Sequence, residues 1–391
     1  MRKTIIPLCL LAAATATAAE PQTGSGETGG YHLVWQDLFD GDQLRADRWN
    51  IEVNGGGGGN NELQFYSDRP ENVRVGDDGE GNGCLILTAR REDYRGRHFT
   101  SGRVNSKNLV AFKHGKIEAS IKLPATANGL WPAFWMMGND YDMVGWPRCG
   151  ETDILEMGHQ KGIANGTTDR FFNGACHWGP KWPNASYAQE TTKSYSLQDG
   201  KFHLFTLVWD EKRIMMFVDL DKKPAQTPYY RIDIEENNPD DEWAASNYFH
   251  KENFILFNVA VGGNFPGISK AEEITALNDA NGQEASMYVN YVKVYQKGSD
   301  DESLFALAPG DELSESGVDS MADDALPRPD IIVSGGFARA ENCEMEVFDL
   351  AGRRVAAGYS YIDLRALLPG TYVATACDRL HNRKTTIKIC I

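Results

Sequence analysis

A short acidic run in the middle of the chain carries residues that could perform acid, base or nucleophilic chemistry. Residues 149–156 read Cys-Gly-Glu-Thr-Asp-Ile-Leu-Glu. Because side chains alternate along an extended strand, Glu151 and Asp153 would share one face, and a regular strand would turn Glu156 to the other. Burying a lone carboxylate among apolar side chains is costly. We therefore expect one extra residue, a β-bulge between Asp153 and Glu156, which returns Glu156 to the shared face.

Three acids on one face repel one another, and a purely structural strand gains nothing from them. Retaining glycoside hydrolysis uses such a pair, with two carboxyl groups about 5 to 5.5 Å apart. One is ionised and attacks the anomeric carbon, while the other is protonated and assists the leaving oxygen. Glu151 and Glu156, leaning together across Asp153, could meet this spacing. The alternative is a solvated strand face on which acids happen to alternate, and the spacing by itself leaves both interpretations open.

Longer motifs on both sides of the acids resemble the laminarinases of glycoside hydrolase family 16. The resemblance implies that Glu151 is the nucleophile, Asp153 its helper and Glu156 the acid/base. We expect the negative field of Glu151 and Asp153 to raise the pKa of Glu156 and keep it protonated for the first step. The matching motifs occur in the family's order at 35–41, 60–66, 129–138, 145–157, 175–179, 257–267 and 287–295, so the resemblance covers about residues 31–296.

Aromatic side chains near the acids are candidate sugar contacts, because the C–H faces of sugar rings pack on aromatic rings. The tryptophans that flank the acids are Trp131, Trp135, Trp146 and Trp178. A tryptophan on a strand more often belongs to the core. The resemblance implies sugar binding for the first two, and both interpretations stay open for the other two. His177 by itself would be a structural histidine, but its His-Trp-Gly motif resembles one near the family's acid/base and implies a contact on the leaving-group side.

Polar residues in the same motifs are candidate partners for sugar hydroxyls. Asn61 and Arg103 resemble family residues that bond to sugar beyond the cleavage point, although an arginine on a strand is often only solvated or ion-paired. Glu62 and Asn258 also occupy motif positions, and each could instead hold a loop in place. We predict all four as substrate-binding residues.

Strand patterns dominate residues 31–296. Short apolar or alternating runs are broken by Gly, Pro, Asn and Asp, with little helical periodicity. The pattern predicts an all-β protein, and its length suits a concanavalin A-like β-jelly-roll sandwich of two stacked sheets, which the resemblance also implies. One sheet face is then free to form a cleft. Runs of strand length include 84–90, 115–123, 202–209, 214–219 and 287–295.

The predicted organisation has four parts. Residues 1–19 combine basic residues, a short apolar run and small residues, which predicts a signal peptide and a secreted or cell-surface protein. The catalytic domain is expected at 20–297. Residues 298–329 form an acidic linker, since nine acidic residues and no Lys or Arg lie between Asp300 and Asp324. A small C-terminal β-sandwich domain is expected at 330–391.

The C-terminal region resembles the sorting domain that the type IX secretion machinery of Bacteroidetes recognises. The matching features are residues 347–353, residues 368–372 and a final basic and apolar strand. The chain departs from that pattern at Ile391, where a basic last residue is often seen. The resemblance implies the secretion machinery as a partner. A carbohydrate-binding module is the alternative.

Composition narrows the choice of partners. The formal net charge of −16 over 391 residues disfavours nucleic acid and anionic membrane surfaces, and is compatible with a neutral polysaccharide. No later stretch reaches the roughly 18 uninterrupted apolar residues of a membrane span. We therefore expect neither nucleic-acid binding nor membrane insertion, and we expect a monomer.

A structural calcium is a feature of many family relatives, which use oxygen ligands from the segments that match residues 37–39 and 288–291. Leu38 and Asn290 stand here at the usual acidic positions. A hard cation prefers carboxylate oxygen, so the loss of two acids should weaken binding, although backbone carbonyls could still contribute. We expect that no cofactor is required, and a structural calcium stays open as an alternative.

The predicted function is a retaining endo-glycosidase that hydrolyses laminarin-like β-1,3-glucan, with mixed-linkage β-1,3-1,4-glucan as a further substrate. Same-fold hydrolases of lichenan, agar, porphyran or carrageenan are alternatives, although sulfated galactans would favour more Lys or Arg near the cleft. A non-catalytic glucan-binding protein would not need to hold Glu151 and Glu156 together. A transglycosylase, which differs in acceptor binding, stays open.

Overall fold

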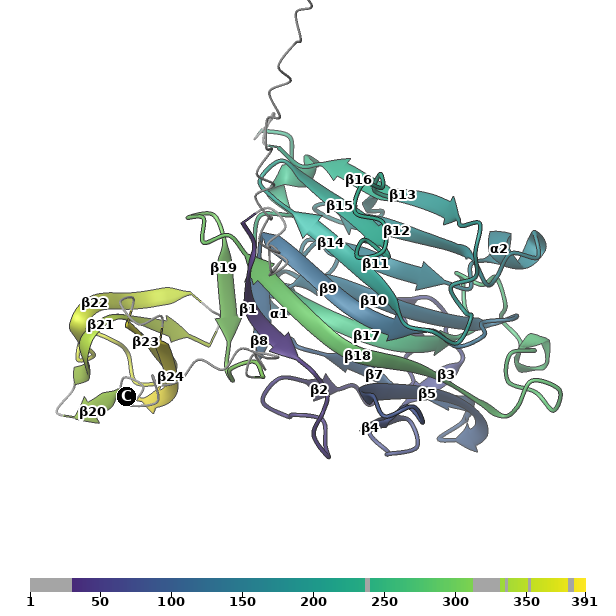
Figure 1. Ribbon diagram of the computed structural model, residues 1–391, viewed down its shortest axis with the longest axis horizontal. Helices are drawn as coiled ribbons and strands as arrows, with labels where there is room; N and C mark the ends of the chain where they lie inside the picture. Colours follow the sequence, from purple (N-terminus) through teal and green to yellow (C-terminus); the bar gives the residue numbers. More distant parts are fainter. Residues whose placement is uncertain (1–29, 236–239, 312–330, 335–336, 351–352, 379–382) are drawn as a thin grey trace, which may run out of the picture.

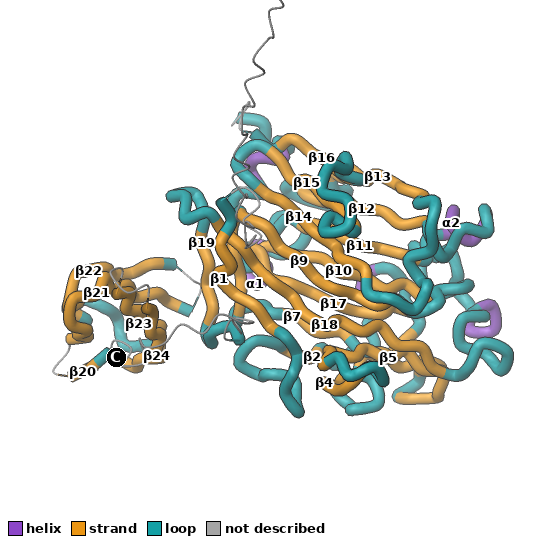
Figure 2. Tube along the Cα trace, viewed as in Figure 1, coloured by secondary structure: helices purple, strands orange, loops and turns teal. Residues whose placement is uncertain are grey.

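Strands dominate the computed structural model, which describes residues 30–235, 240–311, 331–334, 337–350, 353–378 and 383–391 (Figure 1). Figure 2 shows that the helices are short segments outside the sheets, so the predicted all-β class is confirmed. Within those ranges, no helix is long and apolar enough to cross a membrane. The helical segments described are α1 (Tyr141–Val144), α2 (Gln160–Ala164), η1 (Gly57–Gly59), η2 (Ala245–Asn247) and η3 (Ala271–Glu273).

A ten-stranded sheet forms one layer of the large domain. Strand β9 (Gly115–Lys122) shows why its residues fold this way, because alternate residues Ile117, Ala119 and Ile121 are fully buried. The opposite face of the same strand is polar. The path of neighbouring strands is β16 (Tyr230–Asp233), β15 (Arg213–Val218), β14 (His203–Trp209), β9, β18 (Glu284–Gln296), β5 (Gly83–Tyr94), β6 (Arg97–Ser101) and β3 (Gln64–Tyr66), while β1 (His32–Asp37) pairs with β18 and β4 (Val73–Asp77) with β5.

A nine-stranded sheet forms the second layer and carries the acidic run on β11 (Glu151–Met157). Strand β11 lies between β10 and β12, so both of its edges are paired. The acids therefore sit inside a sheet and not on a free edge. The path is β13 (Ala185–Thr192), β12 (Phe171–Trp178), β11, β10 (Leu130–Gly138), β17 (Asn253–Val261), β7 (Arg103–Asn105) and β2 (Asn50–Ile51), while β8 (Val110–Lys113) pairs with β17 and β19 (Ser303–Ala306) pairs with β8.

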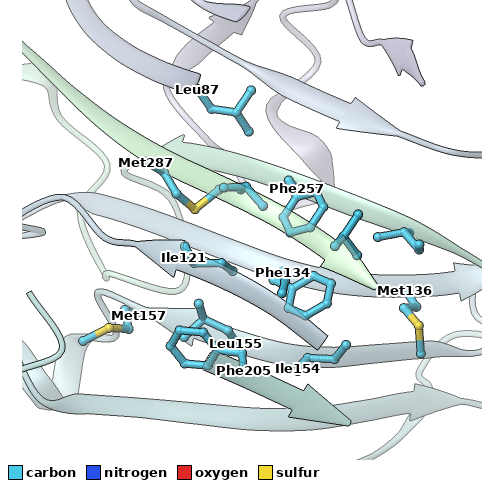
Figure 3. Close-up of a cluster of buried hydrophobic side chains, with 14 of the residues drawn as sticks. Leu87, Ile121, Phe134, Met136, Ile154, Leu155, Met157, Phe205, Phe257 and Met287 are labelled. Atoms are coloured by element: carbon cyan, nitrogen blue, oxygen red, sulfur yellow. The ribbon is translucent and has the colours of Figure 1, made fainter. Parts of the chain in front are cut away.

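One hydrophobic core lies between the two sheets. Figure 3 shows Ile121 and Phe205 from the ten-stranded sheet in the same cluster as Phe134, Leu155 and Phe257 from the nine-stranded sheet. These side chains are fully buried. The predicted sandwich of two stacked sheets is therefore confirmed, and the outward face of β11 is directed away from this core.

The predicted acidic linker is wrong at its start. Residues 303–306 form β19, which pairs with β8 and extends the nine-stranded sheet. Further along, Asp311 accepts hydrogen bonds from the Arg48 guanidinium and from the backbone N–H of Leu38, both at 2.7 Å. Strands β8 and β19 are nearly 200 residues apart in the sequence, so no local sequence pattern predicts that they pair. The rest of the predicted linker and the predicted signal peptide 1–19 lie outside the described residues.

The C-terminal region contains a separate sheet with its own small core. Val347, Ala374 and Ile389 belong to that core. The region is built of strands, as predicted, and the described residues pair into one five-stranded sheet. Its strands are β20 (Ile332–Ser334), β21 (Phe337–Asp349), β22 (Arg354–Asp363), β23 (Thr371–Asp378) and β24 (Arg383–Cys390).

Candidate active site

A β-bulge in β11 brings the three acids onto one face, as the sequence predicts. On β10, Trp135 pairs with Asp153 and the next residue back, Phe134, pairs with Leu155, so Ile154 is the extra residue. The register against β12 shifts at the same point. Both Ile154 and Leu155 reach the core. The hydroxyl of Tyr229 donates a hydrogen bond to the carbonyl of Ile154, which helps to fix the bulge.

Glu156 is held by two side chains from the neighbouring strands. The indole N–H of Trp131 on β10 donates to Oε1 at 3.0 Å, and the amide of Asn173 on β12 donates to Oε2 at 2.8 Å. Glu156 is only 8% exposed. Both oxygens therefore have fixed positions, as a proton donor to a bound substrate requires.

Glu151 and Asp153 lie beside His177, which is opposite Glu151 on β12. A carboxylate oxygen of Glu151, a carboxylate oxygen of Asp153 and a ring nitrogen of His177 all lie within 4.8 Å of one another. Nε2 of His177 is 3.5 Å from Oδ2 of Asp153. The structure thus places His177 beside Glu151 and Asp153, and its contact on the leaving-group side stays a prediction.

The ring of His177 is held by a second contact. The amide nitrogen of Asn184 lies 3.0 Å from Nδ1 of His177 and donates to the carbonyl of Ala185 at 3.1 Å. The contact at Nδ1 leaves Nε2 directed toward Asp153.

Burial and mutual repulsion raise the pKa of all three acids. Burial is the largest cause for Glu156, the charge of Glu151 adds to it, and the bonds from Asn173 and Trp131 oppose it, which raises the pKa to about 7. Burial followed by the charges of both glutamates raises the pKa of Asp153 well above its usual range. Asp153 therefore favours its protonated form.

Glu151 is the acid with the most support for its charged form. Burial raises its pKa, but the charge of His177, a hydrogen bond from Trp146 and the charge of Arg103 act in the opposite direction. The raised pKa of Glu156 is due to burial and the charge of Glu151, and Asp153 is not among its causes, contrary to the expectation. The pKa of Asp153 is itself raised well above its usual range, which disfavours the negative charge that the expectation assigns to it.

The four predicted tryptophans have different surroundings. Trp131 is 9% exposed and stacks on Phe265 with ring centroids 4.6 Å apart, so it positions Glu156 more than it presents an open ring. Trp135 is half-buried and donates to Asn258 at 2.8 Å. Trp146 is 38% exposed, and its side chain lowers the pKa of Glu151.

Trp178 does not face the acids, so its prediction as a substrate contact is wrong. His177 points to the acids, and the next residue on a strand must point to the other face. Trp178 accordingly packs on the hydrophobic core, lies 5.7 Å from Phe249 between ring centroids, and donates to the carbonyl of Trp243 at 2.8 Å.

Arg103 lies on the β17 side of the acids. Its Nε donates to Glu52 at 3.0 Å, and its guanidinium carbon is 4.8 Å from the centroid of the Trp135 ring. Its neighbour on β17 is Asn258, which is 5% exposed. Together with Trp135 these residues form a polar and aromatic flank next to Glu151.

Asn61 and Glu62 differ in what they can offer to a ligand. Asn61 is exposed, has a φ of 57°, and donates to Asn264 at 3.0 Å. Glu62 is 4% exposed and accepts from Gln64 at 2.6 Å and from Tyr66 at 3.1 Å. The carboxylate of Glu62 therefore holds its loop, which corrects its prediction as a sugar contact.

The sequence prediction missed Asn173 and Asn184. Asn173 shares the outward face of β12 with Ala175 and His177, so the two-residue period counted back from His177 could have found it. Asn184 lies in the loop before β13 and has no such periodicity.

The family's calcium position has few oxygen ligands in this chain. Leu38 contributes no side-chain oxygen, and its backbone N–H is bonded to Asp311. The amide nitrogen of Asn290 donates to the carbonyl of Gly83 at 2.9 Å, so an N–H group occupies that carbonyl. Neither residue offers the carboxylate oxygen that calcium prefers.

Comparisons with known proteins agree with this geometry. Residues 62–248 match the family described as Glycosyl hydrolases family 16. A beta-glucanase from Rhodothermus marinus is 31% identical, with 76% of this chain and 95% of that protein covered. A solved Bacteroides ovatus mixed-linkage glucan GH16 structure in complex with a G4G4G3G product is 41% identical, with 66% of this chain and 99% of that chain covered and a TM-score of 0.58.

Two other relatives are much longer proteins. The clotting factor G alpha subunit of Tachypleus tridentatus is 33% identical over 69% of this chain, and glucan endo-1,3-beta-glucosidase A1 of Niallia circulans is 30% identical over 68% of it. The chain spans 34% and 38% of their lengths, respectively.

Proposed function

The chain belongs to glycosyl hydrolases family 16, and on that premise we propose that it is a retaining endo-glycosidase that cleaves β-1,3-glucan and mixed-linkage β-1,3-1,4-glucan. The observation that carries the proposal is the bulge at Ile154, which brings Glu151 and Glu156 to the same face of β11. Glu156 has its pKa raised to about 7, whereas Glu151 has three groups that support its charge. One acid and one nucleophile are therefore available together.

The first half-reaction uses both glutamates. A carboxylate oxygen of Glu151 forms a bond to the anomeric carbon of the sugar, and the bond from that carbon to the leaving oxygen breaks. The proton of Glu156 passes to the leaving oxygen, so one sugar product departs with a new hydroxyl group. Glu156 is then an anion next to a neutral ester of Glu151.

The second half-reaction reverses these roles. Glu156 takes a proton from water, whose oxygen bonds to the anomeric carbon and releases Glu151 as a carboxylate. The pKa of Glu156 then rises again because the charge of Glu151 has returned. Asp153, with a strongly raised pKa, stays protonated and lets the two glutamates share one site with a single negative charge.

A neutral glucan suits the charges around the acids better than a sulfated galactan. The positive charges that lower the pKa of Glu151 come from His177 and Arg103, and Arg103 is already ion-paired with Glu52. The formal net charge of −16 opposes polyanionic substrates in general. The similarity to a glucan endo-1,3-beta-glucosidase of Niallia circulans and to a mixed-linkage glucan GH16 protein of Bacteroides ovatus supports the two glucan classes.

The test compares polysaccharides. Purified protein is incubated with laminarin, barley mixed-linkage glucan, agarose and carrageenan, and the released oligosaccharides are separated by chromatography. We expect oligosaccharides of intermediate length from the first two. Products from agarose or carrageenan alone would overturn the substrate class. Glu190→Gln, on an exposed carboxylate of β13, is the matched control for Glu151→Gln.

We further propose that the protein is exported and needs no bound metal. The composition of residues 1–19 supports export, and the motifs at 347–353 and 368–372 support sorting by a type IX secretion system of Bacteroidetes. Leu38 and Asn290 support independence from calcium. Expression of the full chain and a chain truncated after residue 329 in a Bacteroidetes host, followed by activity in cell and medium fractions, tests the first part. Activity after dialysis against EDTA tests the second.

Oligomeric state is a separate part of the proposal. We expect a monomer, because a lone chain carries both glutamates and the side chains that hold them. Light scattering after size-exclusion chromatography measures the mass directly.

A further inference from the structure

Two exposed tryptophans stand next to the catalytic acids. Trp182 is 71% exposed and Trp146 is 38% exposed, and their ring centroids are 5.6 Å apart with the ring planes tilted by 34°. All nine tryptophans lie within the described ranges, and the other seven are buried or half-buried. Exposed aromatic surface that other side chains leave uncovered is unfavourable in water, and it often marks a binding site.

The Trp146–Trp182 pair lies next to the nucleophile. The side chain of Trp146 is close enough to Glu151 to lower the pKa of that carboxyl group, and Trp182 packs on Trp146. Nε of Arg148 donates to the carbonyl of Pro180 at 2.7 Å, which joins the loop that precedes β11 to the loop that follows β12. The pair is therefore continuous with the catalytic site.

A second route connects the same loop to Asp153. Asn184, two residues after Trp182, contacts Nδ1 of His177, whose Nε2 lies 3.5 Å from Asp153. At the start of the loop, Gly179 has a φ of 128°, and a Cβ there would lie 2.6 Å from the Trp243 ring. The close packing against Trp243 and the contact from Asn184 hold both ends of the loop that carries Trp182.

We propose that Trp182, backed by Trp146, binds a glucose ring of the glucan next to the ring that reacts, on the β12 side of Glu151. The inference rests on the proposed function. On the β17 side, Arg103, Trp135 and Asn258 are bonded to one another or to Glu52. The β12 side instead presents open aromatic surface, which suits the C–H face of a sugar ring.

The occupant is a glucan and not a second protein, because the surface begins at the nucleophile itself. A protein seated on Trp182 would cover the entrance to Glu151 and block the substrate. The two tilted rings also suit a chain of separate sugar rings, each of which offers one flat face.

The experiment measures kcat/KM of Trp182→Ala over a ladder of β-1,3-linked and mixed-linkage oligosaccharides and on laminarin. We expect a loss of about two- to tenfold on long substrates, which disappears for the shortest oligosaccharide that is still cleaved. Trp182→Phe should recover most of the loss. Met143→Ala, on another exposed apolar side chain nearby, should change nothing.

Several outcomes would overturn the inference. Unchanged kinetics of Trp182→Ala on every substrate would remove the site, and an unchanged rate with an altered molecular mass would assign the surface to a protein partner. An equal loss on short and long substrates would mean that Trp182 acts through Glu151 and not on a sugar. Circular dichroism and thermal unfolding check that the variant folds. A wild-type protein without activity on any glucan would instead defeat the proposed function itself.

Discussion

The indole nitrogen of Trp131 lies 3.0 Å from Oε1 of Glu156 and donates a hydrogen bond to it from the adjacent strand. Asn173 bonds the other oxygen from the opposite strand. Both bonds favour the charged carboxylate and lower a pKa that burial and Glu151 raise. The proton affinity of Glu156 is therefore a balance, and changes to its neighbours should move the pH dependence of catalysis.

Trp131→Phe keeps an aromatic ring against Phe265 but removes the bond to Glu156. The pKa of Glu156 should rise, because one stabilising contact to its charged form is lost. The alkaline limb of kcat/KM should move to higher pH, and kcat should fall by about three- to tenfold because Glu156 loses a contact that positions its carboxyl group. Initial rates on laminarin between pH 4 and 9 measure both effects. An alkaline limb that moves to lower pH would contradict this assignment.

The wild-type protein should have a bell-shaped pH profile. The free enzyme must carry a proton on Glu156 and a charge on Glu151. Since the pKa of Glu156 is raised to about 7, kcat/KM should decline above about pH 7 as that proton is lost. The acidic limb should lie above the ordinary range of a glutamate, because burial raises the pKa of Glu151. A profile that stays flat to pH 9 would exclude Glu156 as the acid.

The acids and the sandwich were predictable because they follow from local rules. Strand alternation and the cost of a buried carboxylate predicted the bulge, which the pairing of Ile154 confirms. The same alternation, applied from His177 to its neighbour, would have directed Trp178 to the core. The predicted start of the linker was wrong for another reason. Strand β19 lies within the predicted linker but pairs with β8, nearly 200 residues away in the sequence. Trp182 lies in a loop, where no periodicity marks a residue for function.

A buried ion cluster should make a measurable contribution to stability. The Arg48 side chain is 2% exposed, and its guanidinium nitrogen lies 3.3 Å from a carboxylate oxygen of Asp37 and 2.7 Å from one of Asp311. The contact with Asp311 holds the segment after β19 against the sandwich. Arg48→Ala leaves the buried Asp37 without its cation and should lower the free energy of unfolding by about 3 to 5 kcal/mol. Urea titration followed by tryptophan fluorescence measures the loss.

Arg45→Ala is the matched control for this change. Arg45 pairs with Asp47 at 2.8 Å, but both side chains are about half exposed, so the loss should stay below about 1 kcal/mol. Equal losses in the two variants would mean that the buried cluster contributes no more than a surface pair.

Loss of the acid Glu156 should slow the hydrolysis of a substrate more when its leaving group needs a proton to depart. Glu156→Ala should lower the rate on laminarin by about 10²- to 10⁴-fold, because the sugar leaving group departs only with a proton. A nitrophenyl glycoside of a β-1,3-oligoglucoside has a leaving group that departs without one, so its first step should be nearly preserved, as a burst of nitrophenol. Glu151→Gln should abolish both reactions, by about a thousandfold or more. If Glu156→Ala instead lost the burst completely, or if Glu151→Gln retained it, the roles of the two glutamates would be reversed.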